Sequence, residues 1–282
     1  TEIDLPETLT YIGEGAFSYV PLTSITIPGA VNTIGADAFY DCDLLTSVTF
    51  QPSQTMTPLN IGYTISASDA NGPFYYSPLT TINLDRELVL TDDEGNPFTP
   101  NDWAEGLFAN EHYGDEDNQN QGVSVTLGEQ VKTISDYMFA RSNLQSITIP
   151  ASVTSVGLNA FIDCDYLNTI VFEDGDTPLP VKYQYASSAY WGPFYDSPLT
   201  SITLGREIEY VKEDGTKYTA GETNDGFFTS EESVESLSVT LSDNVKTISE
   251  FMFAGRPIQQ LTIPGSVTFI GNNAFDSCVN LT

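Results

Sequence analysis

Side chains that could catalyse a reaction or bind a metal are few in this chain of 282 residues. The chain has one histidine, His112, and three cysteines, Cys42, Cys164 and Cys278. A Ser-His-Asp or Cys-His group needs a nucleophile placed against an imidazole, and nothing in the sequence pairs one with His112. We therefore predict that the protein is not an enzyme and that it has no catalytic residue, no cofactor and no metal site.

His112 lies in the acidic segment NEHYGDEDNQNQG at 110–122. The alternation of Asp115, Asp117 and Gln119 is similar to the ligand spacing of a calcium-binding loop, but the glycine and the distal glutamate of an EF-hand are missing. We interpret the segment as a solvated polar loop, with calcium binding as the alternative.

Clustered aromatic side chains are the other candidates for binding chemistry. Tyrosine and tryptophan on a loop can stack on a sugar ring or anchor a protein partner, so they predict a ligand-binding surface. The alternative is that they pack the segment 173–196 onto the body of the protein. The candidate ligand-binding residues are Tyr183, Tyr185, Tyr190, Trp191 and Trp103.

The charge of the chain excludes two classes of partner. Acidic residues number 39 against nine lysines and arginines, and the net charge of −30 repels nucleic-acid phosphates and anionic lipid surfaces. The mean hydropathy is −0.14 and no apolar run reaches the about 18 residues of a membrane span, so we expect no membrane insertion. The chain starts with TEIDLPETL, so any secretion signal was removed or lies upstream.

A sequence repeat positions these candidate groups. The segment LTSITIPGAVNTIGADAFYDCDLL at 22–45 returns as LQSITIPASVTSVGLNAFIDCDYL at 144–167 and as IQQLTIPGSVTFIGNNAFDSCVNL at 258–281. The unit reads L-x-x-I-x-I-P-x-x-V-x-x-I-G-x-x-A-F-x-x-C-x-x-L. Self-similarity of this kind is typical of a solenoid, in which each unit packs against its neighbours.

One phenylalanine recurs at the A-F position of each unit, and the number of these phenylalanines indicates about ten repeats. The spacing recurs every four repeats, so 22–143 and 144–257 form two superunits, with partial repeats at both ends. We predict one domain, 1–282, in which these phenylalanines form a single buried column. They are Phe17, Phe39, Phe74, Phe108, Phe139, Phe161, Phe194, Phe228, Phe253 and Phe275.

The alternation in I-x-I-P predicts a strand whose isoleucines face a shared interior. Stacking Ile25 with its equivalents at about 4.8 Å per strand predicts one parallel β-sheet of about ten short strands. The V-x-x-I-G segment predicts a second short strand before a glycine turn, and G-x-x-A-F predicts a helical or 3₁₀ turn. The equivalents of Ile25 are Ile3, Val48, Ile82, Val125, Ile147, Ile170, Ile202, Val239 and Leu261.

The insertions are more varied than the strands. Threonine occupies nearly every outward strand position from Thr26 to Thr262, and it suits an exposed strand by β propensity alone. Residues 86–100 and 206–220 instead have apolar runs on both sides of an acidic turn with glycine, which predicts two β-hairpin insertions. We therefore expect the inserted loops, rather than the sheet, to contact partners.

The repeat unit resembles the BspA-like, or treponemal-type, leucine-rich repeat over essentially the whole chain. The match is specific at 22–45, 144–167 and 258–281 and looser where Pro73-Phe74 or Pro193-Phe194 replaces A-F. The resemblance implies a curved, right-handed, β-rich leucine-rich repeat solenoid. It also implies an extracellular location on a bacterial cell surface, often with a role in adhesion or host contact and without catalysis.

The three cysteines occupy one position in repeats that lie four apart. Stacking therefore separates neighbouring cysteines by about 19 Å, whereas a disulfide needs Cα atoms within about 7 Å. We predict free, buried thiols.

Three functions remain open at this point. The first is a non-enzymatic adhesion or interaction protein that presents its inserted loops to a host or matrix protein. The second is a glycan-binding surface module, and the third is a structural spacer of a larger surface protein. Neither end has the polar face of a capping repeat, so we expect that the natural protein continues beyond Thr282 or that the ends associate end to end.

Overall fold

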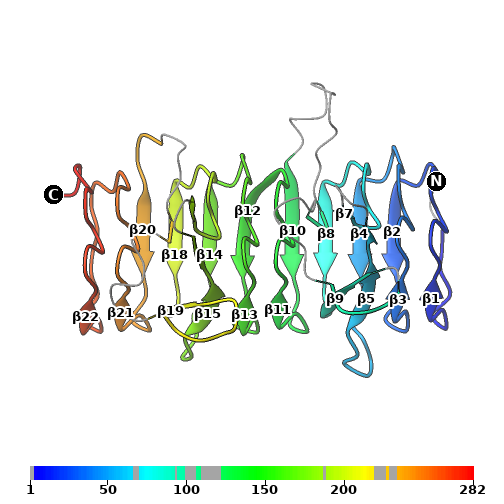
Figure 1. Cartoon of the computed structure of the whole chain (residues 1–282), viewed down its shortest axis with the longest axis horizontal. Coiled ribbons are helices and arrows are strands. Elements are labelled where there is room, and N and C mark those ends of the chain that lie inside the picture. The colour runs from blue at the N-terminus through cyan, green and yellow to red at the C-terminus, as the bar shows by residue number, and fades with distance from the viewer. Residues whose placement is uncertain are drawn as a thin grey trace.

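An apolar residue at every second position gives the strand of each repeat one apolar face, and eight such strands pair in parallel as the main sheet (Figure 1). The computed structural model describes residues 3–65, 70–92, 94–98, 106–108, 122–186, 189–218, 227–228 and 234–282, with the backbone alone at 70, 184–186 and 189–191. The main sheet consists of β2 (Ser24–Ile27), β4 (Ser47–Phe50), β8 (Thr81–Leu84), β10 (Val123–Leu127), β12 (Leu144–Ile149), β14 (Thr169–Phe172), β18 (Ser201–Leu204) and β20 (Ser238–Leu241).

The register of the main sheet confirms the predicted ladder. Ile25 pairs with Val48 and Val48 with Ile82, and the same column continues through Ile202 to Val239. The prediction of about ten strands in this sheet was wrong, because Ile3 and Leu261 lie outside the strands of the described chain and are only partly buried. Each of these two residues belongs to a coil with a neighbour on one side only, so its backbone has fewer pairing partners.

A second line of short parallel strands runs along the opposite flank, as predicted from V-x-x-I-G. It is divided into three sheets: β1 (Tyr11–Ile12), β3 (Thr33–Ile34), β5 (Leu59–Gly62) and β9 (Leu88–Thr91); β11 (Thr133–Ile134), β13 (Ser155–Val156), β15 (Leu179–Lys182) and β19 (Ile208–Val211); and β21 (Thr247–Ile248) with β22 (Phe269–Ile270). The glycine after this strand permits close approach of two coils. A Cβ atom on Gly35 would lie 2.5 Å from the amide nitrogen of Glu14 in the preceding coil.

The A-F segments form stacked turns, and the part of the chain that the structure describes contains no helix. The amides of Phe39 and Asp41 donate to the carbonyls of Pro73 and Tyr75 in the next coil, whereas the amide of Tyr40 donates to Asp37 within its own turn. Asp37 and Asp41 have φ angles of 54° and 52°. The predicted helical turn was therefore wrong, because a backbone that returns to the left-handed region every fourth residue cannot continue as a helix.

The ten phenylalanines of the A-F positions form one continuous stack, as predicted. Successive rings are stacked in parallel at centroid separations such as 5.3 Å for Phe17 and Phe39, 5.5 Å for Phe139 and Phe161, and 5.6 Å for Phe253 and Phe275. The stack passes through both insertion repeats at Phe108 and Phe228. A single hydrophobic core therefore extends from the first coil to the tenth.

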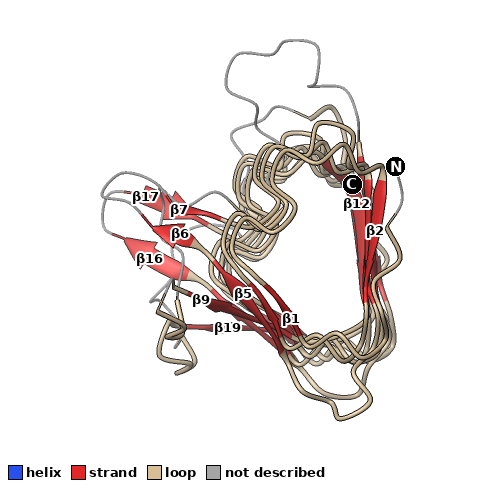
Figure 2. Cartoon of the chain, turned by 90° about the vertical axis from the view of Figure 1, so that its right-hand side faces the viewer, coloured by secondary structure: helices blue, strands red, loops and turns tan. Residues whose placement is uncertain are grey.

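In the described part of the chain, hairpins leave the flank of the solenoid at four places. Two are antiparallel hairpins that the sequence did not predict as such: β6 (Thr64–Ile65) with β7 (Ala70–Asn71), and β16 (Gln184–Ala186) with β17 (Ala189–Trp191). Figure 2 shows all four of these strands on the side of the solenoid where β9 and β19 lie. The other two insertions are the hairpins predicted at 86–100 and 206–220.

The predicted hairpins branch from the flank sheets and interrupt them. The first limb of each hairpin is β9 or β19 itself. The second limb, called the return limb here, contains Pro97 in one hairpin and Lys217 in the other, and these residues pair antiparallel with Thr91 and Val211. The amide of Tyr218 also donates to the carbonyl of Tyr210 at 3.1 Å. The return limb thus occupies the strand edge that would pair with the next coil, which explains why the flank sheets end after β9 and after β19.

Candidate functional site

The structure places one of the predicted ligand-binding residues in the protein interior. The side chain of Tyr183 is 1% exposed, and its ring lies 6.0 Å from that of Tyr210 and 5.7 Å from that of Tyr218. The Tyr218 hydroxyl donates to the Tyr183 carbonyl at 2.9 Å. Tyr183 therefore does not belong to a binding surface; it packs the insertion onto the solenoid, which was the alternative.

Of the other predicted residues, the structure describes only the backbone of three, all in the β16–β17 hairpin. Tyr185 pairs with Tyr190 across the β16–β17 hairpin and Trp191 pairs with Gln184, but these side chains lie outside the described part of the structure. Trp103 and His112, with the acidic loop around it, also lie outside the described residues. Their roles stay predictions.

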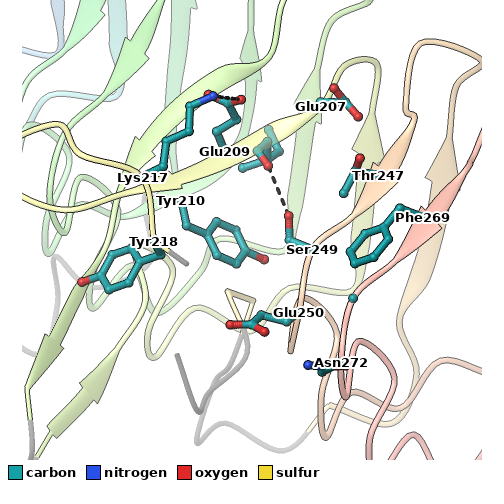
Figure 3. A pocket seen from close by; sticks show the side chains of 12 residues that line it. Glu207, Glu209, Tyr210, Lys217, Tyr218, Thr247, Ser249, Glu250, Phe269 and Asn272 are labelled. Atoms are coloured by element: carbon teal, nitrogen blue, oxygen red, sulfur yellow. Dashed lines mark hydrogen bonds and ion pairs between the residues drawn. The ribbon is translucent and has the colours of Figure 1, made fainter. Parts of the chain in front are cut away.

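A cleft that the sequence did not predict lies where the flank sheet is interrupted after β19. It has a volume of about 250 Å³ and is bounded by β19, the return limb of its hairpin, β21 and β22 (Figure 3). Because the return limb takes the edge of β19, β21 cannot pair with it, and a gap opens between the two sheets. The side chains that line the cleft are those of Glu207, Ile208, Glu209, Tyr210, Lys217, Tyr218, Thr247, Ser249, Glu250, Phe269 and Asn272.

The cleft carries more acidic than basic side chains. Glu209 forms an ion pair with Lys217, with 2.6 Å between Oε1 and Nζ, and the Lys217 side chain is 67% exposed. Glu207 accepts a hydrogen bond from the backbone amide of Lys246 at 3.2 Å, so its carboxylate holds the start of the next coil. With Glu250 as the third carboxylate and Lys217 as the one lysine among the lining residues, the lining is net negative.

Tyr210 provides a buried polar group at the base of the cleft. Its side chain is 7% exposed, and its hydroxyl interacts with the Ser249 side chain without forming a hydrogen bond of ordinary geometry to any described residue. Figure 3 shows this hydroxyl directed toward the space between Ser249 and Glu250. Burial, together with the neighbouring Tyr183 and Glu250, raises the pKa of Tyr210 well above its usual value, so the phenol stays neutral.

Aromatic rings form the walls of the cleft. Phe269 occupies an outward position of β22 and is 59% exposed, and Tyr218 stands on the return limb of the hairpin. The ammonium of Lys212 lies 5.3 Å from the centre of the Tyr218 ring, which is a cation–π contact at the margin of the cleft. The arrangement has the chemistry of a binding site, and it shows no nucleophile activated by a base.

The first superunit offers an internal comparison for the cleft. At the positions of Glu209, Tyr210, Lys217 and Tyr218 it has an apolar set, and the position of Phe269 corresponds to a serine in the next repeat, the first of the second superunit. The corresponding residues are Val89, Leu90, Pro97, Phe98 and Ser155. A position-by-position comparison of the two superunits is thus the sequence signal that could have indicated the cleft, because the hairpin carries Glu209, Lys217 and two tyrosines in only one copy, whereas Glu207 and Glu250 have acidic counterparts in Glu87 and Asp136.

The cysteines were predicted as free, buried thiols, and they are free. Cys42 and Cys164 are buried, but Cys278 is partly exposed because its coil has a neighbour on one side only. Each thiol donates to the carbonyl of a phenylalanine in the preceding coil, as Cys164 does to Phe139 at 3.0 Å. Among the described residues, no group of three or more His, Cys, Asp or Glu could hold a metal ion.

Burial predicts a difference in thiol reactivity. Burial raises the pKa of Cys164 from 9.0 to about 12, which lowers its thiolate fraction at pH 8 about a thousandfold. Iodoacetamide at this pH is expected to modify Cys278 first and to leave Cys164 unmodified in the folded protein, whereas all three react in urea. Peptide mapping by mass spectrometry gives the rates, and similar rates for Cys164 and Cys278 in the folded protein would contradict the burial.

Comparisons with known proteins agree with this architecture. The family model described as "BspA type Leucine rich repeat region" matches six copies over residues 1–89 and 117–219. No curated protein matches the chain. In the described residues, no helix has the length and apolar character needed to cross a membrane.

Solved structures resemble the chain at low sequence identity. One is a leucine-rich repeat protein from Bacteroides ovatus, with 22% identity over 99% of this chain and 64% of that chain and a TM-score of 0.44. Another is a leucine rich cell surface protein from Faecalibacterium prausnitzii, with 22% identity over 97% of this chain and 76% of that one and a TM-score of 0.33. The pneumococcal vaccine antigen PcpA is 16% identical over 94% and 67% of the two chains, with a TM-score of 0.34.

The present chain spans less than two thirds of the Bacteroides protein. The family model itself covers more than half of the present chain, and the stacked parallel strands and the phenylalanine column extend through all its repeats. This protein belongs to the BspA-type leucine-rich repeat family.

Proposed function

We propose that this protein is a non-enzymatic, extracellular recognition protein of a cell surface, which binds a host or matrix protein through the insertions on its flank. The observation that carries the proposal is the position of these insertions. The β6–β7 and β16–β17 hairpins lie on the side of the solenoid that also carries β9 and β19 with their turns (Figure 2). Varied segments on one face of a rigid scaffold are typical of recognition proteins.

The main sheet supports the choice of the flank by contrast. The outward columns of its eight strands carry serine or threonine throughout, apart from Asn83 and Val171, and they contain no charged side chain. Protein interfaces are instead enriched in aromatic and arginine side chains. The uniform face of the sheet is therefore the poorer candidate for a specific partner.

The test removes the hairpins and keeps the solenoid. Replacement of residues 64–71 and 184–191 by short Gly-Ser links is expected to abolish saturable binding of the labelled protein to immobilised matrix and mucosal proteins. The control variant Thr148→Ala with Thr203→Ala alters the main sheet and is expected to bind as the unmodified protein does. Absence of saturable binding by the unmodified protein, or loss of binding in the control alone, would contradict the proposal.

A glycan ligand is the alternative that the same surface leaves open. Sugar-dependent binding on a glycan array that is lost in Trp191→Ala would show that the ligand is a carbohydrate and not a protein. A blank array together with saturable binding to deglycosylated matrix proteins supports the protein partner.

A further inference from the structure

We propose that the cleft between β19 and β22 receives one cationic side chain, an arginine or a lysine, from the protein partner. This inference rests on the proposed function and names the chemistry of its ligand. The cleft is the space lined by Glu209, Tyr210, Tyr218, Glu250 and Phe269.

The size of the cleft fits a single side chain. Sites that enclose a drug-sized molecule usually have volumes of about 300–1,000 Å³. The cleft has about 250 Å³ and is open on one side, so it has room for one side chain of a peptide and not for an extended oligosaccharide.

The charge of the cleft selects a cation. Glu209 and Glu250 line it, and the protein as a whole has a net charge of −30, which attracts cationic segments of a partner. Lys217 already marks where a cationic group binds, because its ammonium lies 2.6 Å from Glu209. With 67% of its side chain exposed, Lys217 can rotate into solvent and leave Glu209 to a guanidinium or ammonium of the ligand.

Tyr210 and the aromatic walls complete the complementarity. The Tyr210 hydroxyl is a buried acceptor without a hydrogen bond of ordinary geometry among the described residues, and an N–H donor of a cation can supply one. Aromatic faces attract cations, and the contact of Lys212 with Tyr218 at 5.3 Å is an example within this hairpin. Phe269 provides an exposed ring on the opposite wall.

The hairpin of the first superunit lacks three of these groups, although Asp136 occupies the position of Glu250 and forms an ion pair with Lys182 at 3.0 Å. Val89, Leu90 and Phe98 replace Glu209, Tyr210 and Tyr218 on the same hairpin backbone. The hairpin therefore does not need a carboxylate or a phenol at these positions in order to fold. The polar side chains of the second copy are thus explained by binding of a ligand rather than by the fold.

The experiment uses a peptide with one charge. The probe is acetyl-Ser-Gly-Arg-Gly-Ser-amide, and its binding to the whole protein is measured by calorimetry at physiological salt against the isosteric citrulline peptide. The citrulline peptide is expected to bind at least about tenfold more weakly, because it keeps the shape and loses the charge. Equal binding of the two peptides would overturn the inference.

Variants locate the bound charge. Glu209→Gln is expected to weaken arginine binding about fivefold to tenfold and Tyr210→Phe about threefold, whereas Lys217→Ala, which removes the competing ammonium, strengthens it about threefold. Glu14→Gln in the N-terminal partial repeat and Lys132→Ala in the first superunit make the same charge changes far from the cleft and are expected to have little effect. If each control matches its counterpart, the peptide binds by diffuse attraction and the inference fails.

The two proposals fail separately. If the cleft variants leave peptide binding unchanged while the hairpin deletion still abolishes binding to matrix proteins, the cleft is excluded and the recognition function stands. If the unmodified protein binds no matrix protein, the function fails even where the peptide binds.

Discussion

Phe161→Ala is expected to lower the free energy of unfolding by about 3–5 kcal/mol, the largest effect of any single substitution considered for this protein. The Phe161 ring is fully buried, and it stacks between Phe139 at 5.5 Å and Phe194 at 5.2 Å. Truncation to alanine removes both ring contacts and leaves a cavity that the neighbouring coils cannot fill, because their spacing is set by the backbone ladders on every side.

The control for Phe161 is Thr148→Ala. Thr148 is an outward residue of β12 that pairs with Val171 of β14 and is exposed to solvent. Its replacement is therefore expected to change stability by less than about 1 kcal/mol. Urea denaturation followed by circular dichroism compares the two variants. Similar midpoints for both would contradict the assignment of Phe161 to the core and Thr148 to the surface.

Arg206→Met is expected to lower the free energy of unfolding by about 2–4 kcal/mol. The Arg206 side chain is 2% exposed, and its guanidinium donates to the carbonyls of Val153 at 2.8 Å, Pro150 at 2.9 Å and Ala151 at 3.4 Å. These carbonyls belong to a coil two repeats earlier. The arginine therefore links its own coil to that coil across the intervening repeat.

The same arrangement occurs in the first superunit. Arg86 is 1% exposed and donates to the carbonyls of Val31 at 2.8 Å and Thr57 at 3.0 Å. Burial lowers the pKa of Arg86 and of Arg206 below the usual value, and this burial is the reason that loss of the guanidinium leaves carbonyls without water or donor. The buried guanidinium therefore has the same structural role in both superunits.

Two further variants test the arginine prediction. Arg206→Lys is expected to recover less than half of the loss, because one ammonium cannot reproduce the planar donors of a guanidinium. Arg141→Met is the partly exposed control: Arg141 pairs with Asp163 at 3.4 Å, with 28% of its side chain exposed, and its loss is expected to change stability by less than about 1 kcal/mol. A stability of Arg206→Met equal to that of Arg141→Met in thermal or urea unfolding would refute the role of the buried guanidinium.

The repeated positions were predictable because each repeat contacts equivalent positions in its neighbours. Phe39, Phe161 and Phe275 recur at one site of one motif, so a single translation from coil to coil places all of them in one column. The same reasoning predicted the ladder of Ile25 and its equivalents, the second short strand, and the free cysteines. The irregular positions were not predictable in this way, because no neighbouring repeat constrains them.

Which insertion residues face the interior was decided by tertiary packing. Tyr183 is a tyrosine in an aromatic-rich insertion, which is typical of a binding residue. In the folded chain, however, its ring packs against Tyr210 and Tyr218. The turns required knowledge of the neighbouring coil as well, because the amide of Phe39 bonds to Pro73 in that coil and not within a helix.

By itself, the sequence determined the periodic scaffold, since short-range repetition of apolar residues specifies which side chains share the interior. Only the tertiary structure decided that the return limb at Lys217 takes the edge of β19, and hence that a cleft opens beside Tyr210 and Glu209. The physical reason is that one strand edge can pair with only one neighbour, and the outcome of that competition depends on contacts between segments that no local pattern records.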